Sequence, residues 1–157
     1  LFDFETDKSS NYEAEKYKKG SKAEKYSKIL KNIFNYNYKF EGYDRAANIF
    51  WPGNKIGHGR ESIKEKWNSL KAIFSNIKFT IEHVGFLEEA GQNPRISIRW
   101  FLEGTHSKDS MDYDKASNKK IFIMGINHAE FYSNSIIREW VLFDEVAIWK
   151  QILLNHG

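Results

Sequence analysis

Two apolar runs on either side of a short polar turn constrain the C-terminal third of the chain. The runs are IFIMGINHAEF (121–131) and IIREWVLFDEVAIWKQI (136–152), and YSNS lies between them. Runs rich in β-branched and aromatic residues that flank a turn predict a β-hairpin. This is the strongest hairpin signal in the sequence, and any fold for the chain has to accommodate it.

The polar residues inside the two runs fall on a period of two. His128 and Glu130 therefore share one face of the first strand, and Arg138, Trp140 and Asp144 share one face of the second. Unpaired buried charge costs several kcal/mol, so such a face carries ionisable groups only where they pair with each other or line a cavity. We expect all five side chains to share one inward face that forms the wall of a pocket.

Length and composition favour one globular domain. The 157 residues are 41% hydrophobic, 29% charged and 16% aromatic, which is enough to bury a core with bulky aromatic walls. Residues 1–20 are polar and without sustained periodicity, so we expect a loosely ordered arm there and a single domain over 21–157.

Features that are missing from the sequence argue against several kinds of partner and site. The net charge of +3, with Lys and Glu interspersed, does not match a nucleic-acid-binding surface. No apolar run reaches the length of a membrane span, so no membrane contact is expected. With no cysteine, disulfides and Cys-ligated metals are excluded. The first residues lack the features of a signal peptide, which favours a cytoplasmic location, although a leader removed before residue 1 stays open.

Periodicity then assigns the remaining segments. Ser21 to Glu24 has the spacing of a capping box and opens a predicted amphipathic helix. A short second helix is expected over Asp44–Phe50, an extended piece over Lys55–Gly59, and a third helix from Glu61 to Phe74. Alternating patterns predict strands over 77–87 and 96–103, followed by a mobile loop over 107–118, the hairpin and a final helical turn near 148–154. Helices followed by strands predict an α+β fold with helices on one face of a curved antiparallel sheet.

Four segments in this order resemble the SnoaL-like polyketide cyclases of the nuclear transport factor 2-like superfamily. They are GHGRESIKEKW (57–67), ISIRWFLEGTH (96–106), NKKIFIMGINHAEF (118–131) and IIREWVLFDEVAIWKQI (136–152). The resemblance implies a cone-shaped α+β barrel, cystatin-like in outline, in which a strongly bent, mostly antiparallel sheet wraps the N-terminal helices and encloses an apolar pocket. It also implies catalysis without a cofactor or metal in active members, and homodimers.

The resemblance assigns roles to residues of the hairpin. The W-x-x-x-D pattern places Asp144 at the position of the acid/base carboxylate, with Trp140 beside it, and places His128 and Glu130 on the pocket side of the preceding strand. Desolvation among apolar neighbours would raise the pKa of Asp144 toward neutrality, as a general acid/base requires. Asp144 and His128 are thus the catalytic candidates.

Structural alternatives exist for both catalytic candidates. Asp144 can instead accept hydrogen bonds from backbone donors at the strand end or from Arg138. His128 can form a buried pair with Glu130 rather than bind substrate, and Glu130 and Arg138 are candidate cross-strand partners.

Five residues are candidate substrate contacts. In the fold that the resemblance implies, the segment around His58 contributes a pocket-lining residue, although a plain loop histidine before a helix fits equally well. Trp100 and Arg99 point to opposite faces, and we expect Trp100 in the pocket wall and Arg99 outside. The substrate-binding candidates are therefore His58, Trp100, Glu130, Arg138 and Trp140. No histidines stand at short ligand spacing, so no metal site is expected.

Two functions remain open from the sequence. The first is a cofactor-independent enzyme of aldol cyclase, isomerase or dehydratase type, in which Asp144 and His128 move a proton on a small, apolar, oxygenated molecule. The second is a non-catalytic module that binds a hydrophobic ligand or serves as a dimeric accessory protein. An enzyme predicts Asp144 inside a closed cavity, whereas a binding module predicts interior polar groups that are already paired with each other.

Overall fold

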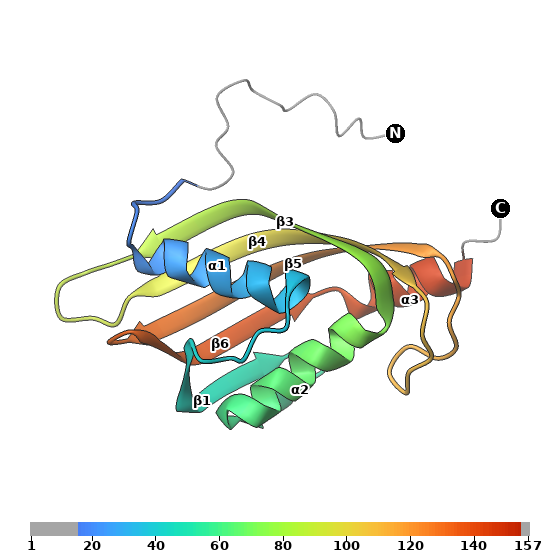
Figure 1. Cartoon of the computed structure of the whole chain (residues 1–157), viewed down its shortest axis with the longest axis horizontal. Helices are drawn as coiled ribbons and strands as arrows, with labels where there is room; N and C mark the ends of the chain where they lie inside the picture. The colour runs from blue at the N-terminus through green and yellow to red at the C-terminus, as the bar shows by residue number, and fades with distance from the viewer. Residues whose placement is uncertain (1–15, 155–157) are drawn as a thin grey trace, which may run out of the picture.

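The computed structural model describes residues 16–154 (Figure 1). The predicted arm over 1–20 lies outside these residues as far as position 15. Across the described part no helix combines the length and apolar character that a membrane crossing needs. The elements are α1 (Lys22–Asn35), β1 (Tyr43–Trp51), β2 (Lys55–His58), α2 (Gly59–Ala72), β3 (Phe74–Leu87), β4 (Arg95–His106), β5 (Lys120–Tyr132), β6 (Ser135–Phe143) and α3 (Glu145–Leu154).

The described strands form one bent sheet in the order β2-β1-β6-β5-β4-β3. β1 and β6 run parallel, and every other neighbouring pair is antiparallel. Figure 1 shows α1 and α2 lying against the same face of this sheet, while α3 follows β6 at one end. The predicted α+β cone is confirmed, with the qualification that the sheet curls without closing, because β2 and β3 are its two edges.

The first helix begins where the capping pattern predicts it. The Ser21 hydroxyl accepts a hydrogen bond from the Glu24 N–H at 3.2 Å, and the Glu24 carboxylate accepts one from the Gly20 N–H at 2.5 Å. The first contact satisfies a backbone donor that the first turn leaves free, and the second ties the Glu24 side chain to the residue before the cap. The helix then turns one apolar stripe toward the sheet, and its fully buried members include Tyr26, Leu30 and Ile33.

The predicted helix over Asp44–Phe50 is wrong, because this segment is the central part of β1. Helix-compatible residues such as Ala46 and Ala47 misled the prediction. In the sheet the segment pairs with β2 on one side and β6 on the other, and these two backbone ladders outweigh a weak local helix preference. Trp51 ends β1 in an extended conformation, which is the geometry that Pro52 favours for the residue before it.

The predicted hairpin is confirmed as β5 and β6. Tyr132 and Ser135 pair with each other and enclose its two-residue turn. Within the turn, Ser133 takes a left-handed backbone conformation with φ 52°. Farther along, His128 faces Trp140 and Glu130 faces Arg138, with a bulge between Glu130 and Phe131. The register therefore fixes which residues share a face.

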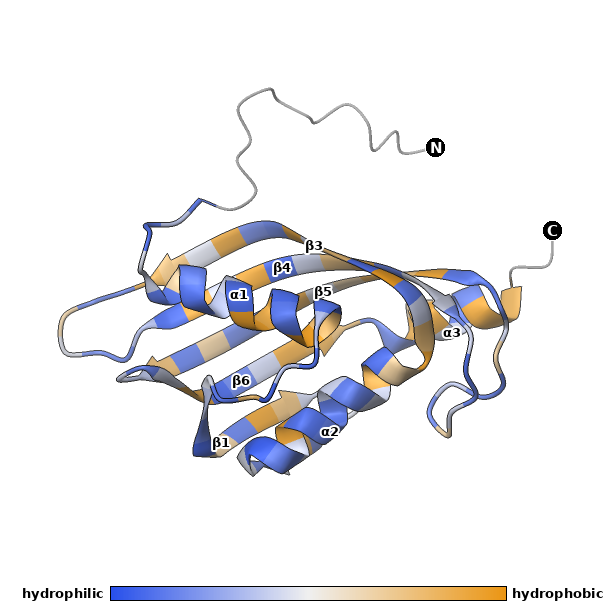
Figure 2. Ribbon diagram, in the orientation of Figure 1, coloured by the Kyte–Doolittle hydropathy of each residue, from blue (hydrophilic) through white to orange (hydrophobic). Residues whose placement is uncertain are grey.

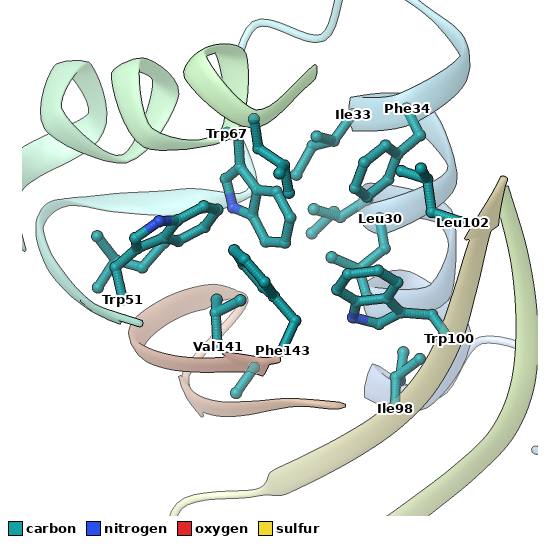
Figure 3. Close-up of a cluster of buried hydrophobic side chains, with 14 of the residues drawn as sticks. Leu30, Ile33, Phe34, Trp51, Trp67, Ile98, Trp100, Leu102, Val141 and Phe143 are labelled. Carbon is teal, nitrogen blue, oxygen red and sulfur yellow. The ribbon is translucent and has the colours of Figure 1, made fainter. Parts of the chain in front are cut away.

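Aromatic side chains fill the space between the helices and the sheet. Figure 2 shows polar and apolar residues alternating along the strands and an amphipathic α1. Figure 3 shows Trp51, Trp67, Trp100 and Phe143 crowded together between the helices and the sheet. The ring of Trp51 meets those of Trp67 and Phe143 edge-on, with centroids 5.0 and 5.4 Å apart. The interior of the cone is thus occupied by the protein's own side chains.

Gly125 should prove essential to this packing. A Cβ at Gly125 would collide with the indole ring of Trp100, and overpacking of a core costs about 1–3 kcal/mol. We expect Gly125→Ala to lower the free energy of unfolding by about that amount in urea denaturation. Gly85→Ala is the matched control, since nothing lies within 4 Å of its added Cβ, and equal losses in the two variants would contradict the explanation.

Candidate functional site

The polar face of the hairpin points away from the helices. Its residues alternate with buried ones that face α1 and α2, such as Glu139 and Val141. Trp140 is 38% exposed and stacks on Phe50 of β1, with ring centroids 5.3 Å apart. The expectation that His128, Glu130, Arg138, Trp140 and Asp144 face inward is therefore wrong. Apolar residues occur on both faces of these strands, so alternation alone did not identify the inner one.

Asp144 is exposed and lies just after β6, at the start of α3. Its carboxylate accepts a hydrogen bond from the Ala147 N–H at 3.0 Å, which is the contact of a helix N-cap. This geometry matches the structural alternative, in which Asp144 accepts bonds from backbone donors at the strand end. A part for Asp144 in catalysis remains an untested prediction, and it would have to act outside the cone.

His128, the second catalytic candidate, lies half-buried on the outer face. Its Nδ1 is 3.1 Å from the Ser97 hydroxyl of β4, and its ring meets that of Trp140 edge-on. Burial lowers the pKa of His128, and the nearby charge of Arg95 lowers it further. Its partner is thus Ser97 rather than Glu130, so the predicted His–Glu pair is wrong.

Glu130 and Arg138 form the predicted cross-strand ion pair, with 2.9 Å between Arg138 Nη1 and Glu130 Oε2. The Asn93 amide donates to the other carboxylate oxygen of Glu130 at 2.8 Å. This hydrogen bond is the main cause that lowers the pKa of Glu130, and the charge of Arg138 acts in the same direction. The two charged residues therefore satisfy each other on the outer face.

Trp100 and His58 were both expected to line the interior, but only Trp100 lies there. Trp100 is fully buried in the interior, while Arg99 lies outside and pairs with Glu82 at 3.2 Å, so the predicted division between the two faces is confirmed. A part for Trp100 in substrate binding stays a prediction. His58 is exposed, directly precedes α2 and contacts the Asn48 side chain at 2.8 Å. It is the last residue of β2 and the N-cap residue of α2, and it does not line the interior.

A carboxylate that does face inward is that of Glu139, a residue absent from the predicted site. It is fully buried, and its oxygens accept four hydrogen bonds from four other elements. The donors are Tyr26 Oη at 2.5 Å, Tyr43 Oη at 3.0 Å, Trp67 Nε1 at 3.2 Å and Asn127 Nδ2 at 3.0 Å. Asn127 also accepts from Trp100 Nε1 at 2.8 Å. We call this set of residues the Glu139 network.

Two opposing effects set the ionisation of Glu139. Burial raises its pKa above the ordinary value of 4.5, whereas the four donors lower it, and the net direction is upward. Burial also raises the pKa values of Tyr26 and Tyr43 well above the usual value, with the charge of Glu139 as the next cause. The two phenols consequently stay protonated and serve as donors to the carboxylate.

A signal for this network was present in the sequence. Glu139 lies between Arg138 and Trp140, so it belongs to the face that Val141 and Phe143 share, and Asn127 belongs to the face of Gly125 and Ala129. Small residues such as Gly125 and Ala129 leave room for large aromatic side chains, so their face is the one expected to pack against the helices. The larger number of charges on the opposite face masked this signal.

An open pocket borders the aromatic interior. It has a volume of about 130 Å³ and lies between β1, α2, the 107–118 loop and α3. We call it the Trp51 pocket; its apolar walls are Trp51, Leu70, Tyr113 and Phe143, and its charged rim includes Lys55, Lys66 and Glu145. The Tyr113 hydroxyl is 3.5 Å from Glu145 Oε1, and burial raises the pKa of Tyr113 well above its usual range. Glu65, Ser69 and Asp112 complete the lining, so the Trp51 pocket combines aromatic rings with a largely polar and charged surround.

Within residues 16–154, no group of three His, Asp or Glu side chains gathers in a way that could hold a metal ion. The Glu139 network contributes one carboxylate, two phenols, two indoles and one amide. That is a hydrogen-bonding set rather than a ligand set for a cation.

Glu139 should leave a signature in the pH dependence of stability. Because its pKa is higher in the folded state, its contribution favours folding below 4.5 and is lost as pH rises through the folded-state pKa. In Glu139→Gln one donor of the network is left unpaired, at a cost of about 1–3 kcal/mol. We expect the stability difference, wild type minus variant, to be largest at acid pH and to shrink as pH rises above 4.5.

Glu130→Gln is the matched control for this measurement. The pKa of Glu130 is lowered by folding, so its stabilisation is present above the unfolded-state pKa and is lost on acidification. The wild-type-minus-variant difference should therefore grow with pH for Glu130→Gln and shrink for Glu139→Gln. Urea denaturation at a series of pH values measures both, and slopes of the same sign would contradict the assignment.

Comparison with known proteins identifies the family and agrees with the fold. The family model for SnoaL-like polyketide cyclases matches residues 49–152, and no match was found among curated protein sequences. Solved structures with the same fold include a candidate SnoaL-like polyketide cyclase from Jannaschia sp. CCS1, with 12% identity, TM-score 0.66 and coverage of 87% of this chain and 97% of that one.

Two further structures extend the comparison. A SnoaL-like polyketide cyclase from Agrobacterium tumefaciens C58 has 19% identity, TM-score 0.59 and coverage of 81% and 94%. A protein with a ketosteroid isomerase-like fold from Catenulispora acidiphila, in complex with trimethylamine, has 12% identity, TM-score 0.62 and coverage of 80% and 89%. At these identities the structures establish the fold alone. Because the family model spans more than half of the sequence, the chain belongs to the SnoaL-like polyketide cyclase family.

Proposed function

We propose that the protein is a binding module that takes a small, apolar, oxygenated molecule in the Trp51 pocket. The observation that carries the proposal is the state of Glu139. A carboxylate offers about four acceptor positions, and four donors of the protein occupy Glu139 while no part of it is exposed. Interior polar groups that already satisfy one another leave no group free to bind or protonate a substrate.

The Trp51 pocket supports binding of a fragment-sized ligand. Pockets for drug-sized ligands span roughly 300–1,000 Å³, so a volume of about 130 Å³ admits a smaller molecule. Trp51, Phe143 and Tyr113 offer ring faces and edges to an apolar body. The ammonium groups of Lys55 and Lys66 at the rim can donate to hydroxyl, carbonyl or carboxylate oxygens of the ligand.

An enzyme of cyclase, isomerase or dehydratase type is the second candidate. The family membership favours it, as does a buried carboxylate with a raised pKa beside two phenols, since general acids and bases are tuned in this way. In this candidate Glu139 takes the role first assigned to Asp144 and His128. A substrate would have to displace Trp67, which donates to Glu139 and packs against Trp51.

Ligand-dependent thermal stabilisation tests the binding proposal. 2-Naphthol and 2-naphthoate should raise the melting temperature by an amount that grows with ligand concentration, because both bind the native state only. Ser69→Trp places a large ring in the Trp51 pocket from α2 and should abolish the shift. Glu61→Trp, at an exposed position of the same helix, should preserve it.

The same compounds separate the two candidates. Each is incubated with wild type and with Glu139→Gln, and mass spectrometry follows the compound. Binding without conversion supports the module, whereas conversion by wild type that Glu139→Gln abolishes would replace it with the enzyme. A shift that survives in Ser69→Trp would contradict the Trp51 pocket as the site.

We also propose that the protein acts as a homodimer through the outer face of the sheet. Met124, Ile126, Trp140 and Leu142 form an exposed apolar patch on β5 and β6, and Leu142 is 66% exposed. Large exposed patches of this kind mark interaction sites. Two ion pairs, Arg99–Glu82 and Arg138–Glu130, lie on the same face, so both charge signs are available for the self-complementary contact that a two-fold dimer requires.

A charge placed in this patch should dissociate the dimer. We expect light scattering coupled to size-exclusion chromatography to give a mass of two chains for wild type and of one chain for Met124→Asp. Met111→Asp is the matched control, because Met111 is fully exposed in the 107–118 loop. A monomeric wild type, or a dimeric Met124→Asp, would contradict the proposed interface.

A further inference from the structure

A polar pocket rich in lysine lies at the C-terminal end of α1. It has a volume of about 330 Å³ and lies between the segment after α1 and the outer side of α2. We call it the lysine pocket, and it is lined by Asn37, Tyr38, Lys39, Lys64, Asn68 and Lys71. No acidic side chain of the described residues contributes to its lining. It shares no lining residue with the Trp51 pocket.

Lys71 is held in place at the base of the lysine pocket. Its ammonium donates to the Ile33 carbonyl at 2.9 Å, and burial lowers its pKa. An ammonium carries three donors, so two remain after this bond. The free carbonyl groups at the C-terminal end of a helix carry partial negative charge and would repel an anion. At the end of α1, however, the Ile33 carbonyl accepts a hydrogen bond from Lys71, and the Asn32 carbonyl accepts one from the Tyr36 N–H at 2.9 Å.

The other two lysines of the pocket are poorly neutralised by the protein. Lys64 has Glu61 as its partner at 3.7 Å, and the Glu61 side chain is 90% exposed, which makes this a weak surface pair. Lys39 is exposed and forms no ion pair with the described residues. Gathering positive charges around one hollow is unfavourable unless an anion neutralises them.

Tyr38 is anchored in the wall of the lysine pocket by two contacts. The Tyr38 hydroxyl accepts from the Gly42 N–H at 2.8 Å, and its ring packs on Phe40 with centroids 5.2 Å apart. A second hollow, lined by Tyr36, Asn37 and Lys71 among others, adjoins it. Tyr36 is 71% exposed there, so its ring is available for stacking.

We propose that the lysine pocket binds the diphosphate group of a small molecule. Lys39, Lys64 and Lys71 supply the positive charge, and the amides of Asn37 and Asn68 add hydrogen-bond donors at the edge. Free pyrophosphate and a nucleoside diphosphate present the same group. A nucleoside diphosphate adds a base that can stack on Tyr36.

Isothermal titration calorimetry with sodium pyrophosphate and with ADP tests the site. The variant Lys39→Ala/Lys64→Ala removes two charges and leaves Lys71 in place, because Lys71 also covers the end of α1. We expect wild type to bind both probes, with affinity that falls as salt increases, and the double variant to lose roughly tenfold or more in affinity. ADP that binds more tightly than pyrophosphate, with the advantage lost in Tyr36→Ala, identifies a nucleotide.

Lys108→Ala/Lys115→Ala is the matched control, since both lysines are exposed in the 107–118 loop. It should bind both probes as wild type does. No binding by wild type, equal weakening in the two double variants, or binding of sulfate as tight as that of pyrophosphate would overturn the proposal. Equal melting temperatures without ligand in wild type and both double variants show that the fold is intact.

Discussion

The carboxylate of Glu139 joins more of the structure than any other group described. Its four donors come from α1, β1, α2 and β5, while Glu139 itself lies on β6. A buried charge is tolerable only where it is fully hydrogen-bonded. If any of these elements is displaced, a donor or the carboxylate loses its partner at a cost of about 1–3 kcal/mol. One residue thereby makes the relative positions of five elements depend on one another.

This arrangement separates a packed interior from the hollows and the apolar patch of the surface. Inside the cone, aromatic rings fill the space and the polar groups satisfy one another (Figure 3). The hollows and apolar surface that could receive a ligand or a second chain lie elsewhere, at the open Trp51 pocket, the lysine pocket and the outer face of the sheet. A chain can thus have the fold of this family while side chains fill its interior, because a fold does not by itself determine a function.

Much of the fold could be predicted from the sequence, because its signals are local. The Ser21 cap, the stripes of α1 and α2 and the alternating strands are each encoded within a short window. β1 could not be predicted in this way, since its identity comes from pairing with β2 and with a β6 that lies about ninety residues later. The ladder outweighs the alanines of Asp44–Phe50.

The candidate site was harder to predict for a similar reason. Alternation correctly grouped His128 with Glu130 and Arg138 with Trp140, but it could not tell which group faces the helices. The outer face carries Trp140, Leu142 and Met124, so it is apolar enough to look like a core face. The partners of Glu139 come from elements distant in the chain, and their convergence is a property of the fold alone.

The parallel pairing of β1 with β6 also bears on how the protein is made. The order β6-β5-β4-β3 can form by neighbouring antiparallel pairings, whereas β1 has to wait for a strand at the other end of the domain. During synthesis from the N-terminus, α1, β1, β2 and α2 emerge before the sheet that covers their apolar side chains exists. Among the neighbouring strands described, β1 and β6 are the farthest apart in sequence, so their pairing carries the largest cost in loop-closure entropy. Nascent chains that stop short of β6 would expose this half of the core, which makes them the natural targets of chaperones.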